Sequence, residues 1–138
     1  MQRRSRLRRH KRTRSNLHNS EELTMFTLTR DQQSMVDAVR DFAANELAPH
    51  AAEWDETGHF PIDVLREAGG MGLGAICIDE RFGGSGLGRS DAVRLFEQLA
   101  EGDTTIAAYI SIPNMVVGMI DRHGDDRQRA EWIPTLAT

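Results

Sequence analysis

The chain has 138 residues, of which 39% are hydrophobic and 28% charged, so it is long enough to bury one ordinary core. Its net charge of −4 is unevenly distributed, because residues 1–20 contain basic side chains and no acidic one. The remainder is strongly acidic, which argues against nucleic-acid binding by the folded part, since such a surface needs clustered Lys and Arg.

Neither a membrane span nor secretion is expected. No apolar stretch approaches the roughly 20 residues of a membrane helix, and the N-terminus lacks the apolar block of a secretory signal. The single cysteine, Cys77, lies in an apolar run, which predicts a buried thiol in a reducing compartment. We therefore expect a cytoplasmic protein.

The basic segment, residues 1–24, is interpreted as a disordered tail. Two other interpretations stay open: an Arg-rich transit peptide, which would place the protein in the mitochondrial matrix, and an arm for nucleic acid or another anionic surface. Helical patterning begins directly after Met25, so that residue is an alternative start of the chain. Residues 25–138 form the predicted domain.

The first helix is predicted to begin at Thr29, with Gln32 completing a capping box. A buried stripe is expected where apolar residues recur at helical spacing, at Val36, Val39, Ala43 and Leu47. Pro49 ends or kinks this helix, and residues 51–56 continue it with Trp54 turned toward the core. Gly58 closes the segment.

A short second helix is predicted from Pro61 at its first position to Ala68, with Ile62 on its apolar side. The glycine-rich residues 71–89 are predicted to form a closely packed loop with one extended piece at 75–78. Ser90 is predicted to cap a third helix that ends at Gly102, with an apolar face of Val93, Phe96, Leu99 and Ala100.

A fourth helical segment is predicted from Asp103 to about Arg122, interrupted by Pro113. Its inward side is expected to consist of Ala108, Ile112, Val116, Met119 and Ile120. A last helix, residues 126–137, follows Asp125 as cap and buries Ala130, Ile133 and Leu136. The pattern as a whole predicts an all-α fold.

Gly83-Gly-Ser-Gly-Leu-Gly88-Arg89-Ser90 has the spacing of a phosphate-binding P-loop, with Arg89 in place of the lysine. The run from Val116 to Asp121 resembles the strand and aspartate that would hold magnesium. The lysine is a specific requirement, and no strand–helix alternation supports a parallel sheet. A close-packed turn is therefore the preferred interpretation, and a nucleotide binder the weaker alternative.

Other polar clusters predict no chemistry. The five histidines show no metal-ligand spacing with one another or with Cys77. Glu53, Asp55 and Glu56 form an acidic run of the kind that usually faces solvent. The residues alone thus indicate a helical domain with no self-contained active site.

Two segments resemble the N-terminal domain of acyl-CoA dehydrogenases: residues 72–88 with the Asp103-Thr-Thr105 turn, and Gly124-Asp-Asp-Arg-Gln128 leading to Leu136. Within that family, Ala108-Tyr-Ile-Ser-Ile-Pro-Asn-Met115 and Met119-Ile-Asp121 are similar to the isobutyryl-CoA dehydrogenase branch of valine catabolism. The resemblance covers Met25 to Thr138. Pro113 departs from it, because that branch has histidine there.

The resemblance implies an N-terminal helical bundle, followed in the full family by a middle β-domain and a C-terminal helical domain. Those later domains bind FAD and supply the catalytic carboxylate, so no cofactor is expected on this chain by itself. The full enzyme would dehydrogenate a short branched acyl-CoA, transfer electrons to an electron-transferring flavoprotein and form a homotetramer.

In this family the helix after the Asp103 turn forms part of the acyl pocket, which by resemblance assigns substrate contacts to Ala107, Ala108 and Ser111. Small residues for helix packing are an equal alternative. Without base and flavin, the chain is expected to be inactive, as a truncated product, a deliberately shortened chain or half of a split enzyme. The rival function is a stand-alone helical interaction domain that uses the apolar face of residues 103–122.

Overall fold

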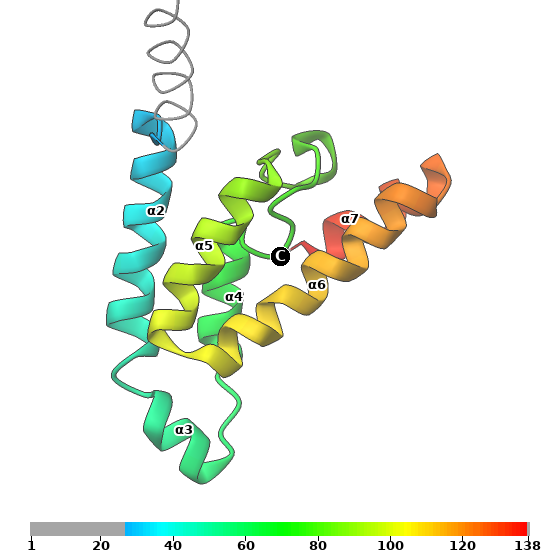
Figure 1. The fold of residues 1–138 in the computed structure, drawn as a ribbon. Coiled ribbons are helices and arrows are strands. Elements are labelled where there is room, and N and C mark those ends of the chain that lie inside the picture. Colours follow the sequence, from blue (N-terminus) through cyan, green and yellow to red (C-terminus); the bar gives the residue numbers. More distant parts are fainter. Residues whose placement is uncertain (1–26, 138) are drawn as a thin grey trace, which may run out of the picture. The chain divides into compact units, whose positions relative to one another are not determined.

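The computed structural model describes residues 27–137, which form six α-helices, one π-turn and one 3-10 turn, and no β-strand (Figure 1). The predicted all-α fold is therefore confirmed for this part of the chain. The predictions made for residues 1–24 and for a start at Met25 lie outside the described residues.

The first described helix, α2 (Arg30–Phe42), begins as the sequence predicts. Thr29 Oγ1 accepts a hydrogen bond from Gln32 N at 3.2 Å, and Gln32 Oε1 accepts one from Thr29 N at 2.9 Å. This reciprocal pair satisfies two amide donors that the first turn of a helix leaves without partners.

From Ser34 onward, the helices pack around a first core cluster. The predicted stripe is confirmed, because Val39, Ala43 and Leu47 are buried and Val36 packs against them. Helix α2 is continued by a π-helical turn, η1 (Ala43–Leu47), which carries the last two residues of this stripe. The members of the first core cluster are Val39, Phe42, Ala43, Leu47, Ala68, Leu73, Ile76, Leu95, Leu99, Ile106, Ala107 and Ile110.

The proline at position 49 separates two helices. It lies in the turn between η1 and α3 (Ala51–Thr57), so the chain stops and restarts there. Trp54 of α3 is partly buried against the first core cluster, as expected. Gly58 ends the helix with a φ of 67°, a left-handed conformation that glycine adopts without strain.

The next helix, α4 (Ile62–Gly70), corrects two details of the sequence prediction. Pro61 occupies the capping position instead of the first helical one, and Ile62 is 52% exposed. Ala68 is buried as predicted. The side of α4 that packs into the core is formed by Val64, Leu65 and Ala68.

Residues 71–78 form turns, so the predicted extended piece at 75–78 is wrong. The turns are held by the returning chain, because Ala75 O accepts from Ser85 N at 3.1 Å and Ile76 O accepts from Leu87 N at 3.0 Å. A Cβ at Gly84 would collide with the carbonyl group of Ile78. The glycines therefore permit close packing around the short turn η2 (Glu80–Phe82).

Helix α5 (Arg89–Gly102) begins two residues earlier than expected, with Gly88 and not Ser90 at the capping position. Its buried residues are Leu95 and Leu99, whereas Val93 is 58% exposed. Ala100 is also exposed. The predicted apolar face therefore points in a different direction from the buried one, because it includes the exposed Val93 and Ala100 and omits the buried Leu95.

Helix α6 (Thr104–His123) continues through Pro113 without interruption and leads to α7 (Asp126–Leu136), as Figure 1 shows. On α7, Ile133 is fully buried and Leu136 partly buried, but Ala130 is exposed. A second core cluster joins the two helices to the glycine-rich loop through Ala75, Ile78, Val117, Ile133 and Ala137. α6 thus contributes to both clusters.

Candidate functional site

Helix α6 is the element in which the sequence placed the substrate contacts, and its position is fixed first at its N-terminus. Asp103 Oδ1 accepts hydrogen bonds from Thr105 N at 2.7 Å and Ile106 N at 3.0 Å. These bonds cap the helix and place the aspartate at the positive end of its dipole. The predicted helix start at the Asp103 turn is confirmed.

A second anchor, which the sequence analysis missed, is the side chain of Asn114 in the middle of α6. Its Oδ1 accepts from Ile76 N at 2.8 Å, and its Nδ2 donates to Leu73 O at 2.6 Å and to Ile110 O at 3.0 Å. The amide thus uses both its donor and its acceptor to tie α6 to the 71–78 turns. One asparagine between the apolar residues 112–113 and 115–117 was the available sequence signal.

The rotation of α6 differs from the predicted one. Ile106, Ala107, Ile110 and Val117 are buried, whereas Ala108 is exposed. Of the residues expected to point inward, Val116 and Ile120 are partly buried, but Ile112 and Met119 are 50% and 58% exposed. We call the resulting solvent-facing stripe, Ala108, Ile112, Met115 and Met119, the exposed α6 face. It is apolar, so α6 carries apolar residues on two sides.

The three predicted substrate contacts do not share one environment. Ala107 is 5% exposed and belongs to the first core cluster. Ala108 and Ser111 are exposed, and Ser111 Oγ donates a hydrogen bond to Ala108 O at 2.6 Å. The structure therefore brings Ala108 and Ser111 together beside the exposed α6 face and places Ala107 in the core.

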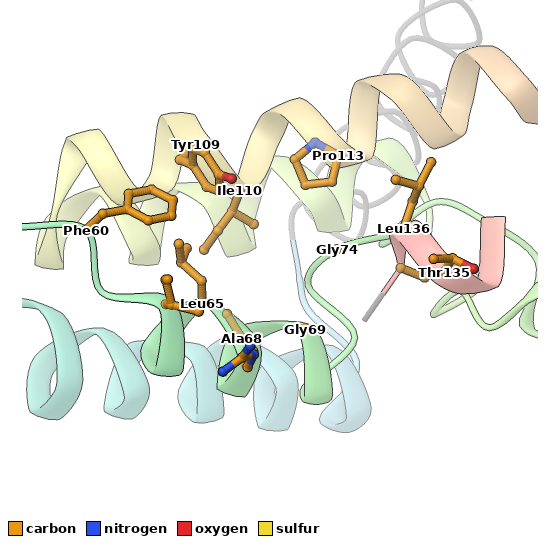
Figure 2. Close-up of a pocket in the computed structure, with 13 residues that line it drawn as sticks. Phe60, Leu65, Ala68, Gly69, Gly74, Tyr109, Ile110, Pro113, Thr135 and Leu136 are labelled. Carbon is orange, nitrogen blue, oxygen red and sulfur yellow. The ribbon is translucent and has the colours of Figure 1, made fainter. Parts of the chain in front are cut away.

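A cavity of about 290 Å³ lies on another side of α6, between α4 and the end of α7. Figure 2 shows Phe60 beside Tyr109, and Ile110 of α6 directed toward Leu65 of α4. The Phe60 and Tyr109 rings meet edge to face with their centroids 4.8 Å apart. Ala107, Ala108 and Ser111 do not line this cavity.

The chemical capacity of this cavity is limited to binding. Its walls are mostly apolar, and Arg66 is the charged residue among them. Arg66 pairs with the exposed Asp63 at 3.1 Å. An apolar group of a ligand would fit such walls, but no acid–base pair is present there to act on it.

Cys77 corrects a further prediction, because it is exposed. Although the residue reaches solvent, surrounding atoms partly desolvate its thiol. This desolvation raises the pKa of Cys77, Arg89 acts to lower it, and Asp91 adds to the increase. At neutral pH the thiol is therefore protonated, which is unfavourable for a nucleophile.

The glycine-rich loop does not have the properties of a P-loop. Its amide groups are already engaged, since Gly84, Ser85 and Gly86 donate to the backbone carbonyls of Asp79, Ala75 and Ile78. Asp121 lies within helix α6, not at the end of a strand. The nucleotide-binding interpretation is therefore wrong, and the loop does not fit the phosphates of a flavin dinucleotide either.

The remaining candidates for chemistry are unremarkable in residues 27–137. Glu53, Asp55 and Glu56 are exposed on α3, as expected for a solvated face. No group of three His, Cys, Asp or Glu side chains is arranged to hold a metal ion in this range. No helix in it has both the length and the apolar character needed to cross a bilayer.

Comparison with known proteins extends the picture beyond the geometry. The chain is 43% identical over 111 residues to the mitochondrial isobutyryl-CoA dehydrogenases of Dictyostelium discoideum and Bos taurus. The match covers 80% of this chain but 27% of each relative, so the chain spans about a quarter of their length. Butyryl-CoA dehydrogenase from Megasphaera elsdenii has a similar structure, with a TM-score of 0.73 and 26% identity, over 81% of this chain and 30% of that one.

The family model of the acyl-CoA dehydrogenase N-terminal domain matches residues 29–138. These residues include the capped start of α2, the glycine-rich loop and the whole of α6 and α7. The match, the identity to the relatives and the helical fold agree. This chain belongs to the acyl-CoA dehydrogenase family and contains its N-terminal domain.

Proposed function

We propose that this chain serves as the N-terminal domain of a flavin-dependent acyl-CoA dehydrogenase that acts on a short branched acyl-CoA such as isobutyryl-CoA. The parent reaction is α,β-dehydrogenation, for which FAD supplies the hydride acceptor. The amides of residues 83–87 already donate to backbone carbonyls, so we assign flavin binding to other parts of the enzyme. We assign the catalytic base to those parts as well. On this proposal the chain is inactive by itself.

The observation that carries this proposal is the exposed α6 face. Ile112, Met115 and Met119 are each at least half exposed, although they lie on the same helix as the buried Ile110 and Val117. An apolar stripe of this kind on a helix is typical of a surface that another structural element or a ligand covers. The family match at residues 29–138 extends through this helix, so we infer that another domain of the dehydrogenase or its acyl-CoA substrate is the cover.

We assign the wall of the acyl pocket to Ala107, Ala108 and Ser111, of which Ala108 and Ser111 would contact the acyl group. Ala108 and Ser111 are exposed next to Ile112, where small side chains leave space for an acyl group. Ala107 lies behind them in the first core cluster, so its contribution would be to keep the helix close to its neighbours. These residues would shape the pocket and would not take part in proton or hydride transfer.

The partners follow from the same proposal. An acyl-CoA is the substrate, an electron-transferring flavoprotein reoxidises the flavin, and the complete enzyme is a homotetramer. Because the two isobutyryl-CoA dehydrogenase relatives are named as mitochondrial, we infer the mitochondrial matrix if residues 1–24 are a transit peptide, and the cytoplasm otherwise.

A chimera tests the function directly. Residues 29–138 of this chain replace the matching segment of the Bos taurus isobutyryl-CoA dehydrogenase, and flavin absorbance and isobutyryl-CoA oxidation are measured. We expect a yellow, active enzyme, whereas the chain by itself is colourless and inactive. A chimera that folds and binds flavin but does not oxidise isobutyryl-CoA would contradict the proposal.

Substitutions within the chimera test the acyl contacts. Ala108→Trp is expected to raise KM for isobutyryl-CoA because the indole would occupy the space left by the methyl group. Ala52→Trp is the matched control, since Ala52 is an exposed alanine on α3. Equal changes in KM from the two substitutions would mean that Ala108 does not line the acyl pocket.

The second candidate is a stand-alone helical interaction domain, and the exposed α6 face favours it as well. The two candidates differ in what the chain does in the chimera. An interaction domain would bind a partner through Ile112 and Met115 while failing to restore dehydrogenase activity. Ile112→Glu would then abolish partner binding in a pull-down without unfolding the chain.

A further inference from the structure

A second cavity, of about 350 Å³, lies where the first turn of α5 meets the C-terminal half of α6. Its walls differ in character. Phe96, Met115 and Met119 form an apolar side, whereas Arg89 and Arg122 supply cationic groups and His123 an imidazole. The cavity is large enough for a small organic ligand.

The two arginines of this cavity lack the partners that other arginines have. Neither Arg89 nor Arg122 forms an ion pair with a carboxylate of residues 27–137. Six other arginines of this range do pair with carboxylates: Arg40, Arg66, Arg81, Arg94, Arg127 and Arg129. Two arginines without a carboxylate partner among these ion pairs therefore line the same cavity.

Helix electrostatics explains one arginine and not the other. Arg122 and His123 lie in the last turn of α6, where cations are favoured by the negative end of the helix dipole. Arg89 is the first residue of α5, where a cation faces the positive end. Asp91 in the same turn already pairs with Arg94 at 3.2 Å. Arg89 therefore carries an electrostatic cost that an anion in the cavity would offset.

We propose that this cavity binds a small phosphate monoester, with its phosphate between Arg89 and Arg122 and its apolar group against Phe96 and Met115. Two guanidinium groups match the charge of a dianion, whereas a carboxylate would leave one of them uncompensated. His123 adds a third donor when protonated. The apolar wall limits the ligand to one with a compact hydrocarbon or aromatic body.

Phenyl phosphate is the probe for this site. Titration into the full chain is followed by the backbone amide NMR signals of residues near the cavity: Cys77, Arg89, Met115, Gly118 and Arg122. We expect saturable shifts at these positions, weaker binding of inorganic phosphate and benzoate, and no shifts with benzyl alcohol. Absence of saturable shifts with phenyl phosphate, or equal binding of inorganic phosphate, would overturn the proposal.

Charge variants separate this site from general attraction to the basic residues 1–20. Arg122→Gln is expected to weaken phenyl phosphate binding by roughly tenfold or more, because a charge-assisted bond is lost. Arg127→Gln removes the same charge from an exposed position outside the cavity and should leave binding unchanged. Equal weakening by both variants would overturn the proposal.

A volume variant tests the cavity without changing any charge. Gly118 lines it, and a Cβ added there meets no atom within 4 Å, so the backbone tolerates a side chain. Gly118→Leu should fill the space and abolish binding while circular dichroism shows an intact helical fold. Unchanged phenyl phosphate binding in this variant would reduce the site to surface electrostatics and contradict the proposal.

Discussion

The two faces of α6 have nearly the same composition and opposite environments. Ile110 is 4% exposed and Ile112 is 50% exposed, although they are two residues apart on one helix. Hydrophobicity therefore does not decide which side of this helix faces the core. The hydrogen bonds of Asn114 to Ile76 N and Leu73 O hold this rotation, and the apolar residues on the other side stay exposed.

The two faces should differ most in how much stability is lost when an isoleucine is replaced by alanine. Ile110→Ala should lower the free energy of unfolding by about 2–5 kcal/mol, because it opens a cavity in the first core cluster. Ile112→Ala should change it by less than about 0.5 kcal/mol, because the side chain is half exposed. Urea unfolding followed by circular dichroism measures both. Similar losses would mean that both faces of α6 are covered in solution.

The anchor of the buried face gives the next largest effect. Asn114→Leu should lower the free energy of unfolding by about 1–3 kcal/mol, because Ile76 N and Leu73 O lose their partner. Asn45→Leu is the control, since Asn45 is exposed on η1. The same urea titration distinguishes them, and an unaffected Asn114→Leu variant would show that the rotation of α6 is set by packing.

Local signals in the sequence predicted several helix ends correctly, although the predicted starts of α4 and α5 were wrong. The Thr29–Gln32 capping box, the Gly58 stop and the Asp125 cap all lie where the pattern placed them. Each of these depends on residues close in sequence, so neighbouring side chains and backbone atoms determine it. The stripe of α2 and η1 was also predictable, because polar residues occupy its other sides.

The sides of α5 and α6 that face the core, and the orientation of Cys77, were not predictable in the same way. On α5 and α6 several apolar stripes fit the helical period, and the packed one is selected by contacts with distant residues such as Leu73 and Ile76. Cys77 was expected to be buried because of its apolar neighbours, but the 71–78 turns direct it outward. The arginines of the second cavity come together from separate helices, which no local spacing reveals.

A smaller effect is expected from substituting two glycines, Gly118 within α6 and Gly102 at the end of α5. Gly118→Ala should raise the free energy of unfolding by about 0.5–1 kcal/mol, because α6 gains helix propensity and the methyl group meets no atom. Gly102→Ala should lower it, because the added Cβ would lie 2.7 Å from Ala43 O. Thermal unfolding of the two variants measures these opposite changes in the free energy of unfolding. A destabilised Gly118→Ala variant would mean that this side of α6 is closely covered.

The smallest effect concerns Cys77, whose thiol reports on the second cavity beside the exposed α6 face. Because Arg89 lowers the pKa of Cys77 and Asp91 raises it, Arg89→Gln should raise the pKa further and Asp91→Asn should lower it. The folded chain holds the thiol proton more tightly than the unfolded chain, so this contribution to stability is present at neutral pH and lost as pH rises through the raised pKa. The rate of alkylation by iodoacetamide as a function of pH measures the pKa in each variant. If phenyl phosphate binds between Arg89 and Arg122, it should slow alkylation of Cys77 in the unsubstituted chain. It should not slow alkylation in the Arg122→Gln variant. An unchanged alkylation rate in the unsubstituted chain at saturating phenyl phosphate would mean that the anion binds elsewhere.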